Sequence, residues 1–213
     1  MNKTESEATL KRLSHYARCL RMAIANGIDI ITSSSIAEPC GISPASVRKD
    51  LAAYGEFGKQ GSGYNPEELL GVIERILGII SPPPVVLLGA GRLGRALLEG
   101  GIPGTKYRFL GAFDIDSTRT GELIGGFKVY HASQMSRVLD GITDFIGMIC
   151  VTPGLAQQAV DLLVKDGCRA ILSFNVEPLH APPGVNIRYT DMPFEMDLLS
   201  HGLKTREGAN EYD

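Results

Sequence analysis

The chain has 213 residues, of which 44% are hydrophobic and 21% are charged, and its formal net charge is −3 at pH 7. This composition is ordinary for a soluble globular protein with one large domain or two small ones. The chain has no apolar run of the roughly 18 residues that a membrane span needs, no signal-peptide pattern, and four widely spaced cysteines without a C-x-x-C pair. We therefore expect no membrane partner, no metal site, no disulfide framework and a cytoplasmic location.

Charge is distributed unevenly along the chain. Residues 1–60 hold 8 Lys and Arg against 6 Asp and Glu, a net +2, whereas the remainder carries −5. The overall negative charge argues against a nucleic-acid binder. A modest basic bias at one end is nevertheless compatible with a DNA-binding head on an acidic body.

The first 80 residues predict helices and one glycine-rich hairpin. Apolar residues at helical spacing predict an amphipathic helix over 8–25, and "TSSSIAEPCGI" predicts a short capped helix. Ser43 as N-cap and Pro44 at the first helical position begin a helix over 44–54. The stretch "GEFGKQGSGY" is typical of a tight β-hairpin, and "NPEE" opens another helix that runs to about residue 80.

The helix over 44–54 is a candidate for DNA recognition. Val47, Leu51 and Tyr54 share its inward face, which leaves small residues and two cations outward. Such a face suits the DNA major groove, where an arginine can bind a guanine edge and other polar groups can hold phosphates. The alternative is a solvated helix face. The candidate DNA contacts are Ser46, Arg48 and Lys49 on the helix, with Lys59 and Gln60 at the hairpin tip.

The run "SPPP" at 81–84 predicts a boundary, because consecutive prolines cannot continue a helix and form a stiff spacer. After it, strands and helices alternate, which is typical of a parallel α/β sheet. The predicted strands are "VVLLG", "YRFLGAFD", "KVYH", "DFIGMICV", "RAILSF" and "VNIRYT", and the predicted helices span 92–99, 132–139, 154–166 and 192–203.

The stretch "VVLLGAGRLG" carries G-x-G-x-x-G between a strand and a helix, as in dinucleotide-binding folds. Gly89 allows the tight turn, Gly91 lets the backbone approach a pyrophosphate, and Gly94 permits close helix–strand packing. Asp114 ends the next strand at the spacing of the acid that bonds a ribose hydroxyl, and Asp116 is the near alternative. An acid there favours NAD over NADP. The other possibility is a glycine-rich turn without a ligand. The same turn includes Ala90, Arg92 and Leu93, of which Arg92 either reaches a phosphate or points to solvent.

The sequence lacks any recognisable catalytic constellation. The four histidines are isolated, and there is neither a nucleophile elbow nor a metal-ligand set. A nucleotide fold without chemistry, fused to a DNA-binding head, is most simply a sensor.

Over essentially its whole length the chain resembles the Rex family of redox-sensing transcriptional repressors. The matching stretches are "RLSHYARCL", "SVRKDLAAYGEFG", "GSGYNPEELL", "LLGAGRLGRALL", "GAFDID", "ILSF" and "YTDM". The resemblance implies a homodimer that binds double-stranded operator DNA through winged helices and binds NADH or NAD⁺ in Rossmann domains. It also implies that the last helix is swapped onto the partner and that NADH removes the protein from DNA.

The resemblance also assigns roles to residues of this chain. Arg48 and Lys49 match the basic residues of the recognition helix. Arg18 and Asp191 match a charged pair that couples the DNA-binding heads to the cofactor state. Thr152 and Pro153 follow a strand at the end where such folds place ligands, and the nicotinamide side includes Ser173 and Asn175 in "SFNVEP".

The chain departs from the family pattern on the nicotinamide side. The family's tyrosine after the first Rossmann helix is replaced by Gly100 or Gly101, and its "NFAP" turn is "SFNVEP", so that Ser173 replaces an asparagine. In the hairpin "GSGY" replaces "GVGY". With fewer polar groups beside the ring, we expect weaker discrimination between NADH and NAD⁺, unless Tyr107 or another side chain fills the gap.

We therefore predict an α/β protein with a winged helix-turn-helix over 1–81, a Rossmann-type parallel sheet over 85–190, and a swapped C-terminal helix and tail over 191–213. The predicted function is redox-sensing transcriptional repression governed by NADH and NAD⁺, without enzymatic activity. The alternatives are a regulator or carrier responding to another adenine nucleotide, such as ATP, ADP or CoA, and a small NAD-dependent enzyme. Met192, Met196, Leu199 and Leu203 form an apolar stripe on the last helix, which either the same subunit or a partner must cover.

Overall fold

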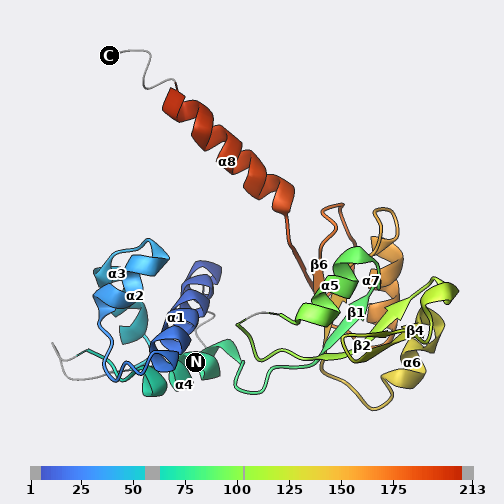
Figure 1. Ribbon diagram of the computed structural model, residues 1–213, viewed down its shortest axis with the longest axis horizontal. Helices are drawn as coiled ribbons and strands as arrows, with labels where there is room; N and C mark the ends of the chain where they lie inside the picture. The colour runs from blue at the N-terminus through green and yellow to red at the C-terminus, as the bar shows by residue number, and fades with distance from the viewer. Residues whose placement is uncertain (1–5, 56–62, 103, 208–213) are drawn as a thin grey trace. The chain divides into compact units, whose positions relative to one another are not determined.

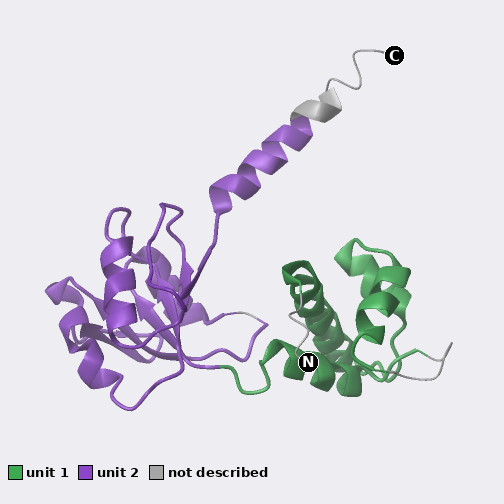
Figure 2. Cartoon of the chain, turned by 180° about the vertical axis from the view of Figure 1, so that it is seen from behind, with its two compact units in different colours: residues 1–82 green, residues 83–213 purple. Residues whose placement is uncertain are grey.

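The computed structural model describes residues 6–55, 63–102 and 104–207, with side chains of the last helix described to residue 203. The chain divides into two compact units, Met1–Pro82 and Pro83–Asp213, which Figure 2 shows in green and purple. The division lies within the run of prolines at 81–84.

Unit 1 is helical, with α1 Glu7–Ala25, α2 Ser33–Cys40, α3 Pro44–Ala52 and α4 Pro66–Leu77 (Figure 1). A side chain caps the N-terminus of each helix, as helices with free N–H groups require. Ser43 accepts from the Ser46 N–H and precedes Pro44 at the first turn, as the sequence predicts. The helix predicted over 44–54 ends at Ala52, and that predicted to reach residue 80 ends at Leu77, where Gly78 adopts a left-handed C-cap with φ +68°.

The apolar faces of these four helices enclose one core. It includes Leu13, Tyr16, Leu20, Ile36, Val47, Leu51, Leu69 and Ile73. The predicted hairpin falls mostly on residues 56–62, outside the described residues. On its flank, Tyr64 forms an antiparallel bridge with Ile31.

Unit 2 contains a seven-stranded sheet in the order β3-β4-β2-β1-β5-β6-β7. All neighbouring strands are parallel except β3, which pairs antiparallel with β4. The two-residue strand β3 is absent from the sequence-based prediction because so short a segment has no periodicity. The strands are β1 Val85–Leu88, β2 Phe109–Asp114, β3 Leu123–Ile124, β4 Phe127–His131, β5 Ile146–Ile149, β6 Ala170–Ser173 and β7 Asn186–Tyr189.

Alternate residues of β1 separate two cores on opposite faces of the sheet. Val86 and Leu88 pack with α6 Met135–Val138 and α7 Ala156–Lys165. Val85 and Leu87 pack with the core that includes Leu98 of α5 Arg92–Gly100. The helix predicted over 132–139 is instead a 3₁₀ turn, Ala132–Gln134, followed by α6. A second 3₁₀ turn, Ser117–Arg119, follows β2.

The last helix, α8 Met192–Glu207, has apolar side chains on two faces. Successive residues turn by roughly 100°, so the predicted stripe shares one face while Phe194 and Leu198 lie opposite Met192. All of these apolar side chains are at least half exposed. Among the described residues, no helix has both the length and the apolar character of a membrane span.

Candidate functional site

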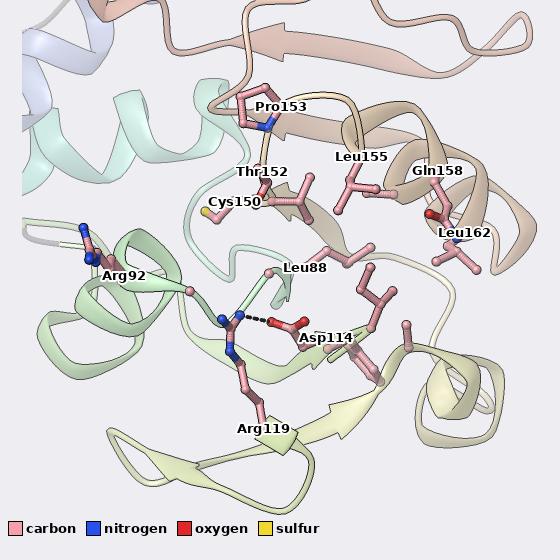
Figure 3. Close-up of a pocket in the computed structure, with 17 residues that line it drawn as sticks. Leu88, Arg92, Asp114, Arg119, Cys150, Thr152, Pro153, Leu155, Gln158 and Leu162 are labelled. Carbon is pink, nitrogen blue, oxygen red and sulfur yellow. Dashed lines mark hydrogen bonds and ion pairs between the residues drawn. The ribbon is translucent and has the colours of Figure 1, made fainter. Parts of the chain in front are cut away.

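A cavity of about 390 Å³ opens at the carboxyl ends of β1, β2 and β5 (Figure 3). The neighbouring strands β1 and β5 are followed by connections in opposite directions, from β1 to β2 on one side and from β5 to β6 on the other. The cavity therefore lies at the topological switch point, where such sheets bind ligands. Six of the sequence-predicted residues line the cavity, namely Gly89, Gly91, Arg92, Asp114, Thr152 and Pro153.

The three glycines of the turn have different roles. Gly89 has φ +97°, and a Cβ there would lie 2.5 Å from the Cys150 carbonyl oxygen. A Cβ on Gly94 would overlap the Gly89 carbonyl oxygen. A Cβ on Gly91 would meet, among the described residues, only the Arg119 guanidinium at 3.8 Å. The fold therefore requires Gly89 and Gly94, whereas the open space over Gly91 is available to a ligand.

The start of α5 differs from the starts of the helices in unit 1. Gly91 is its N-cap, and no described side chain caps the helix. The N–H groups of a first helical turn lack intrahelical partners and carry the positive end of the helix dipole. Together with the open space over Gly91, they form a suitable site for a phosphate or pyrophosphate.

The Asp114 carboxylate links the glycine turn to the loop after β2. One oxygen accepts from the Ala90 N–H at 2.8 Å and from the Arg119 guanidinium at 2.9 Å, and the other accepts from the Asp116 N–H at 2.9 Å. A carboxylate has about four acceptor sites. One site therefore remains, on the oxygen that bonds Asp116, for a hydroxyl group of a ligand.

Arg119 is a site residue that the sequence-based prediction missed. It lines the cavity and points at Asp114 in Figure 3. The bond to Asp114 raises the pKa of Arg119, and a second ion pair of 3.5 Å joins it to Asp116. The signal in the sequence was a cation five residues after Asp114, because the 3₁₀ turn Ser117–Arg119 brings that cation back to the carboxylate. Asp116 itself lies at the edge of the site, where its carboxylate accepts from Thr118.

The loop after β5 forms the opposite wall of the cavity. Thr152 and Pro153 are exposed there, while Cys150 lies deeper. Burial raises the pKa of the Cys150 thiol to about 12, so it remains protonated at neutral pH and is a poor nucleophile. Glu177 accepts from the Gly154 N–H at 3.1 Å and holds this loop.

The remaining predicted cofactor residues lie outside the cavity wall. Ala90 is buried, and Leu93 is 40% exposed on α5. Ser173 and Asn175 are buried, with the Ser173 hydroxyl donating to the Asn175 carbonyl and accepting from its N–H. The Asn175 side-chain amide donates to the Val151 carbonyl at 3.2 Å. Its Oδ1 has no hydrogen-bond partner within the described part of the chain.

In unit 1, α3 places two cations on its outer face. Arg48 and Lys49 are exposed, and Ser46 is half-buried with its hydroxyl 2.9 Å from that of Ser43. Arg48 donates to the Ser33 hydroxyl at the start of α2 at 2.9 Å, so its guanidinium is oriented by the neighbouring helix. Lys59 and Gln60 lie outside the described residues.

The inner face of α3 carries a buried acid that fixes the helix. Asp50 accepts two hydrogen bonds from the Arg12 guanidinium, at 2.6 and 2.8 Å, and a third from the Tyr16 hydroxyl at 2.8 Å. The Arg12 bond lowers the pKa of Asp50 despite its burial. These contacts join α1 to α3 below Arg48 and Lys49, which makes Asp50 a positioning residue for the candidate DNA-binding face.

The two residues of the implied coupling pair lie in different units, and each is described by itself. Arg18 is exposed on α1. Asp191 accepts from the Phe194 N–H at 3.0 Å and so stabilises the first turn of α8.

Comparison with protein-family models gives two matches. Residues 6–52 match the family described as "Putative DNA-binding protein N-terminus", and residues 81–176 match "CoA binding domain". Among solved structures, a protein called RSP, a Rex-family repressor, in complex with β-NAD⁺ and operator DNA has a TM-score of 0.86 and 28% identity, covering 99% of this chain and 97% of that one. RSP in complex with β-NADH has a TM-score of 0.84 and 26% identity, with both chains fully covered.

Curated relatives match along almost the whole chain. The redox-sensing transcriptional repressor Rex of Pelotomaculum thermopropionicum is 41% identical, over 94% of this chain and 95% of that protein. Rex of Desulforamulus reducens is 39% identical, over 94% of this chain and 96% of that protein. These alignments include both the DNA-binding and the nucleotide-binding parts. The chain therefore belongs to the Rex family of redox-sensing transcriptional repressors.

Proposed function

We propose that this protein binds operator DNA through α3 and that NADH and NAD⁺, bound at the carboxyl ends of β1, β2 and β5, control this binding. The observation that carries the proposal is the combination of open space over Gly91, uncapped N–H groups at the start of α5, and a remaining acceptor site on Asp114. These groups match a pyrophosphate next to a ribose hydroxyl. The relative RSP, solved with β-NAD⁺ and operator DNA, supports the same pairing of ligands.

On the DNA side, we propose that Arg48 binds a base edge while Ser46 and Lys49 contact phosphates. The hydrogen bond that Arg48 donates to the Ser33 hydroxyl orients its guanidinium, which favours a specific contact. The exposed Lys49 suits a charge contact without sequence preference. Lys59 and Gln60 are proposed as contacts from the wing.

The adenosine half of the site provides a test of nucleotide choice. Asp114 forms an ion pair with Arg119, so the guanidinium is not free to bind a 2′-phosphate, and the Asp114 carboxylate would repel that phosphate. Calorimetric titration should therefore show NADH and NAD⁺ binding well above NADPH and NADP⁺. Asp114→Asn keeps the shape but releases Arg119, and it should raise relative affinity for the phosphorylated pair. Equal binding of all four nucleotides by the unmodified protein would contradict the role given to Asp114.

On the nicotinamide side, we propose that Asn175 supplies part of the polarity that Ser173 lacks. An unpaired buried acceptor such as Asn175 Oδ1 costs about 1–3 kcal/mol, and a ligand N–H would remove that cost. Gly100 and Gly101 offer no such group, and a Cβ at either would meet nothing within 4 Å in the described parts of the chain. Tyr107 is the aromatic residue that follows these glycines most closely in the sequence, and it is half-buried against the core that includes Leu98 of α5.

We further propose that the protein is a homodimer in which α8 is swapped onto the partner. A helix that is apolar on two faces is stable only when other elements cover both. The swap follows the family resemblance, as does the pairing of Arg18 with Asp191 that couples nucleotide binding to DNA release. Truncation after Thr190 should give monomer or aggregate in sedimentation, whereas a clean DNA-binding dimer would exclude the swap.

The whole proposal is tested with one DNA titration series. A duplex selected by the purified protein from a random library is titrated by fluorescence anisotropy, without nucleotide and with NADH, NAD⁺, ATP or CoA. We expect steep salt dependence and release by NADH. Salt-independent binding, or none, would contradict the DNA-binding role, and release by none of the nucleotides would contradict nucleotide control.

A second candidate is a regulator or carrier that responds to CoA or another adenine nucleotide, which the match to the CoA-binding domain model favours. Release of DNA by CoA or ATP, with NADH inactive, would establish it. We propose that the protein acts in the cytoplasm and is not an enzyme. The relatives are named as repressors, and the cavity's thiol, Cys150, is held protonated.

A further inference from the structure

Two cysteines that are widely separated in the sequence lie together in the DNA-binding unit. The Sγ atoms of Cys19 and Cys40 are 3.9 Å apart. Cys19 is on α1, and Cys40 is the last residue of α2, so the pair spans two packed helices. Both residues are partly exposed, so neither cysteine is sealed in the helical core. The other two cysteines, Cys150 and Cys168, belong to unit 2.

We propose that Cys19 and Cys40 form a reversible intramolecular disulfide when the protein meets a hydroperoxide, and that this bond weakens operator binding. The site is distinct from the nucleotide cavity and gives the protein a second redox input. The thiol chemistry does not depend on the proposed function, whereas its effect on operator binding rests on it.

The reaction uses the hydroperoxide as the two-electron oxidant. The thiolate of one cysteine attacks an oxygen of the hydroperoxide, so that an S–O bond forms as the O–O bond breaks and the sulfur becomes a sulfenic acid. The departing alkoxide, or hydroxide in the case of H₂O₂, takes the proton that the thiol gave up and leaves as the alcohol or water. The sulfur of the second cysteine then attacks the sulfenic sulfur. The S–O bond breaks, the S–S bond forms, and the departing hydroxide takes the second thiol's proton to leave as water.

Burial and the neighbouring sulfur raise the pKa of Cys40 to about 11, which disfavours its thiolate near neutral pH. Because the two sulfurs are 3.9 Å apart, whichever is oxidised first meets the other as its resolving thiol. A dithiol reductant reverses the bond by thiol–disulfide exchange.

The position of Cys40 connects the bond to DNA recognition. An S–S bond of about 2.05 Å requires the two sulfurs to approach by roughly 1.9 Å. Cys40 ends α2, Gly41 forms its left-handed C-cap, and Ser43 already caps α3. Movement at Cys40 is therefore passed over a two-residue turn to the start of the recognition helix. Arg18 lies close enough to influence the Cys40 thiol, so the bond forms beside the proposed coupling residue.

Peptide mapping of the full-length protein tests the bond directly. After treatment with H₂O₂ and alkylation of free thiols, tryptic digestion should join residues 19–21 to residues 22–48, with the loss of two hydrogens. Cys150 and Cys168 should be alkylated, which makes them internal controls. Separate, alkylated peptides after oxidation would overturn the proposal, and so would a Cys19–Cys40 bond found only between subunits on a non-reducing gel.

Operator binding tests the consequence. Oxidation should lower affinity by at least about tenfold, within the usual range of allosteric coupling, and dithiothreitol should restore it. Cys19→Ser and Cys40→Ser should bind DNA as the reduced protein does and lose the response to H₂O₂. Full affinity in the disulfide form would overturn the regulatory role. If the reduced protein fails to bind any selected duplex, the proposed DNA-binding function fails, while mass mapping still decides the disulfide.

Discussion

Replacing Asp50 by Asn should loosen α3 without changing its outer face. Asp50 is 8% exposed and accepts three hydrogen bonds, two from Arg12 and one from Tyr16. The amide is nearly the same size but removes the negative charge, and it leaves the Arg12 guanidinium without its counterion. The expected result is lower stability of the contact between α1 and α3 and weaker operator binding.

The exposure of the partner sets the magnitude. Removing one member of a fully buried ion pair costs about 3–5 kcal/mol. The Arg12 side chain is 32% exposed, so water recovers part of this cost and we expect about 2–3 kcal/mol. At about 1.4 kcal/mol per factor of ten, amide hydrogen exchange in Pro44–Ala52 should accelerate by roughly 30- to 160-fold.

The matched control is Asp144→Asn. Its ion pair with Arg169 has an N–O distance of 3.2 Å, but both side chains are more than 70% exposed, and such surface pairs contribute about 0–1 kcal/mol. Hydrogen exchange followed by mass spectrometry reads each segment separately, which suits a chain of two units. Exchange in α3 of the Asp50→Asn protein within about threefold of the unmodified protein would refute the idea that Asp50 fixes α3 against α1.

The same contact predicts a dependence on pH. Arg12 lowers the pKa of Asp50 in the folded state, so its stabilisation is fully present above the usual carboxyl pKa of about 4. It is lost as the pH falls through the lowered folded value. Protection of α3 should therefore decline in acid in the unmodified protein, and Asp50→Asn should flatten that decline.

Three further results are expected. In anisotropy titrations, Arg48→Ala should weaken binding to the selected duplex by about 1–3 kcal/mol without weakening binding to scrambled DNA. Lys49→Ala should weaken binding to both DNAs. Equal losses on the two DNAs for Arg48→Ala would contradict a base contact. Gly91→Val should abolish nucleotide binding in calorimetry and leave the melting temperature unchanged, whereas Gly94→Ala should lower the melting temperature. A destabilised Gly91→Val protein would show that the fold itself needs the space over that residue. Because a ligand shifts an equilibrium only by its differential contacts, release of DNA by NADH should be blunted by excess NAD⁺ more than in typical relatives; sharp release unaffected by NAD⁺ would refute this.

The sequence predicts best what depends on local chemistry. The cap at Ser43 and Pro44 at the first turn are decided within a few residues, and the glycine turn has both its strand and its helix in one stretch. The end of α4 was predicted about three residues too late, because Gly78 was not recognised as its C-cap. The alternation of strands and helices predicted a parallel sheet, and the sheet is parallel except at β3. The resemblance to Rex repressors is confirmed by relatives that match the whole length.

Contacts between distant residues could not be predicted in this way. Arg12 meets Asp50 across 38 positions, and Cys19 meets Cys40 across 21, because helix packing rather than spacing brings them together. Asp50 looked like one more charge in "VRKDL", although it is buried. The second apolar face of α8 was missed for another reason. The predicted stripe already had helical spacing, and Phe194 and Leu198, which lie between its members in the sequence, were not included in it.

The internal bonds of Asp114 have a consequence for what such a sensor measures. Ala90 and Asp116 hold the carboxylate in place without help from a ligand, so the adenosine half of the proposed site is already formed. NADH and NAD⁺ share the adenosine moiety, so a site that is already formed makes the same contacts with either nucleotide. The two forms then compete for one binding site, and the occupancy by either depends on their relative amounts. Where the two forms together saturate the site, a repressor built this way reports the ratio of reduced to oxidised nucleotide.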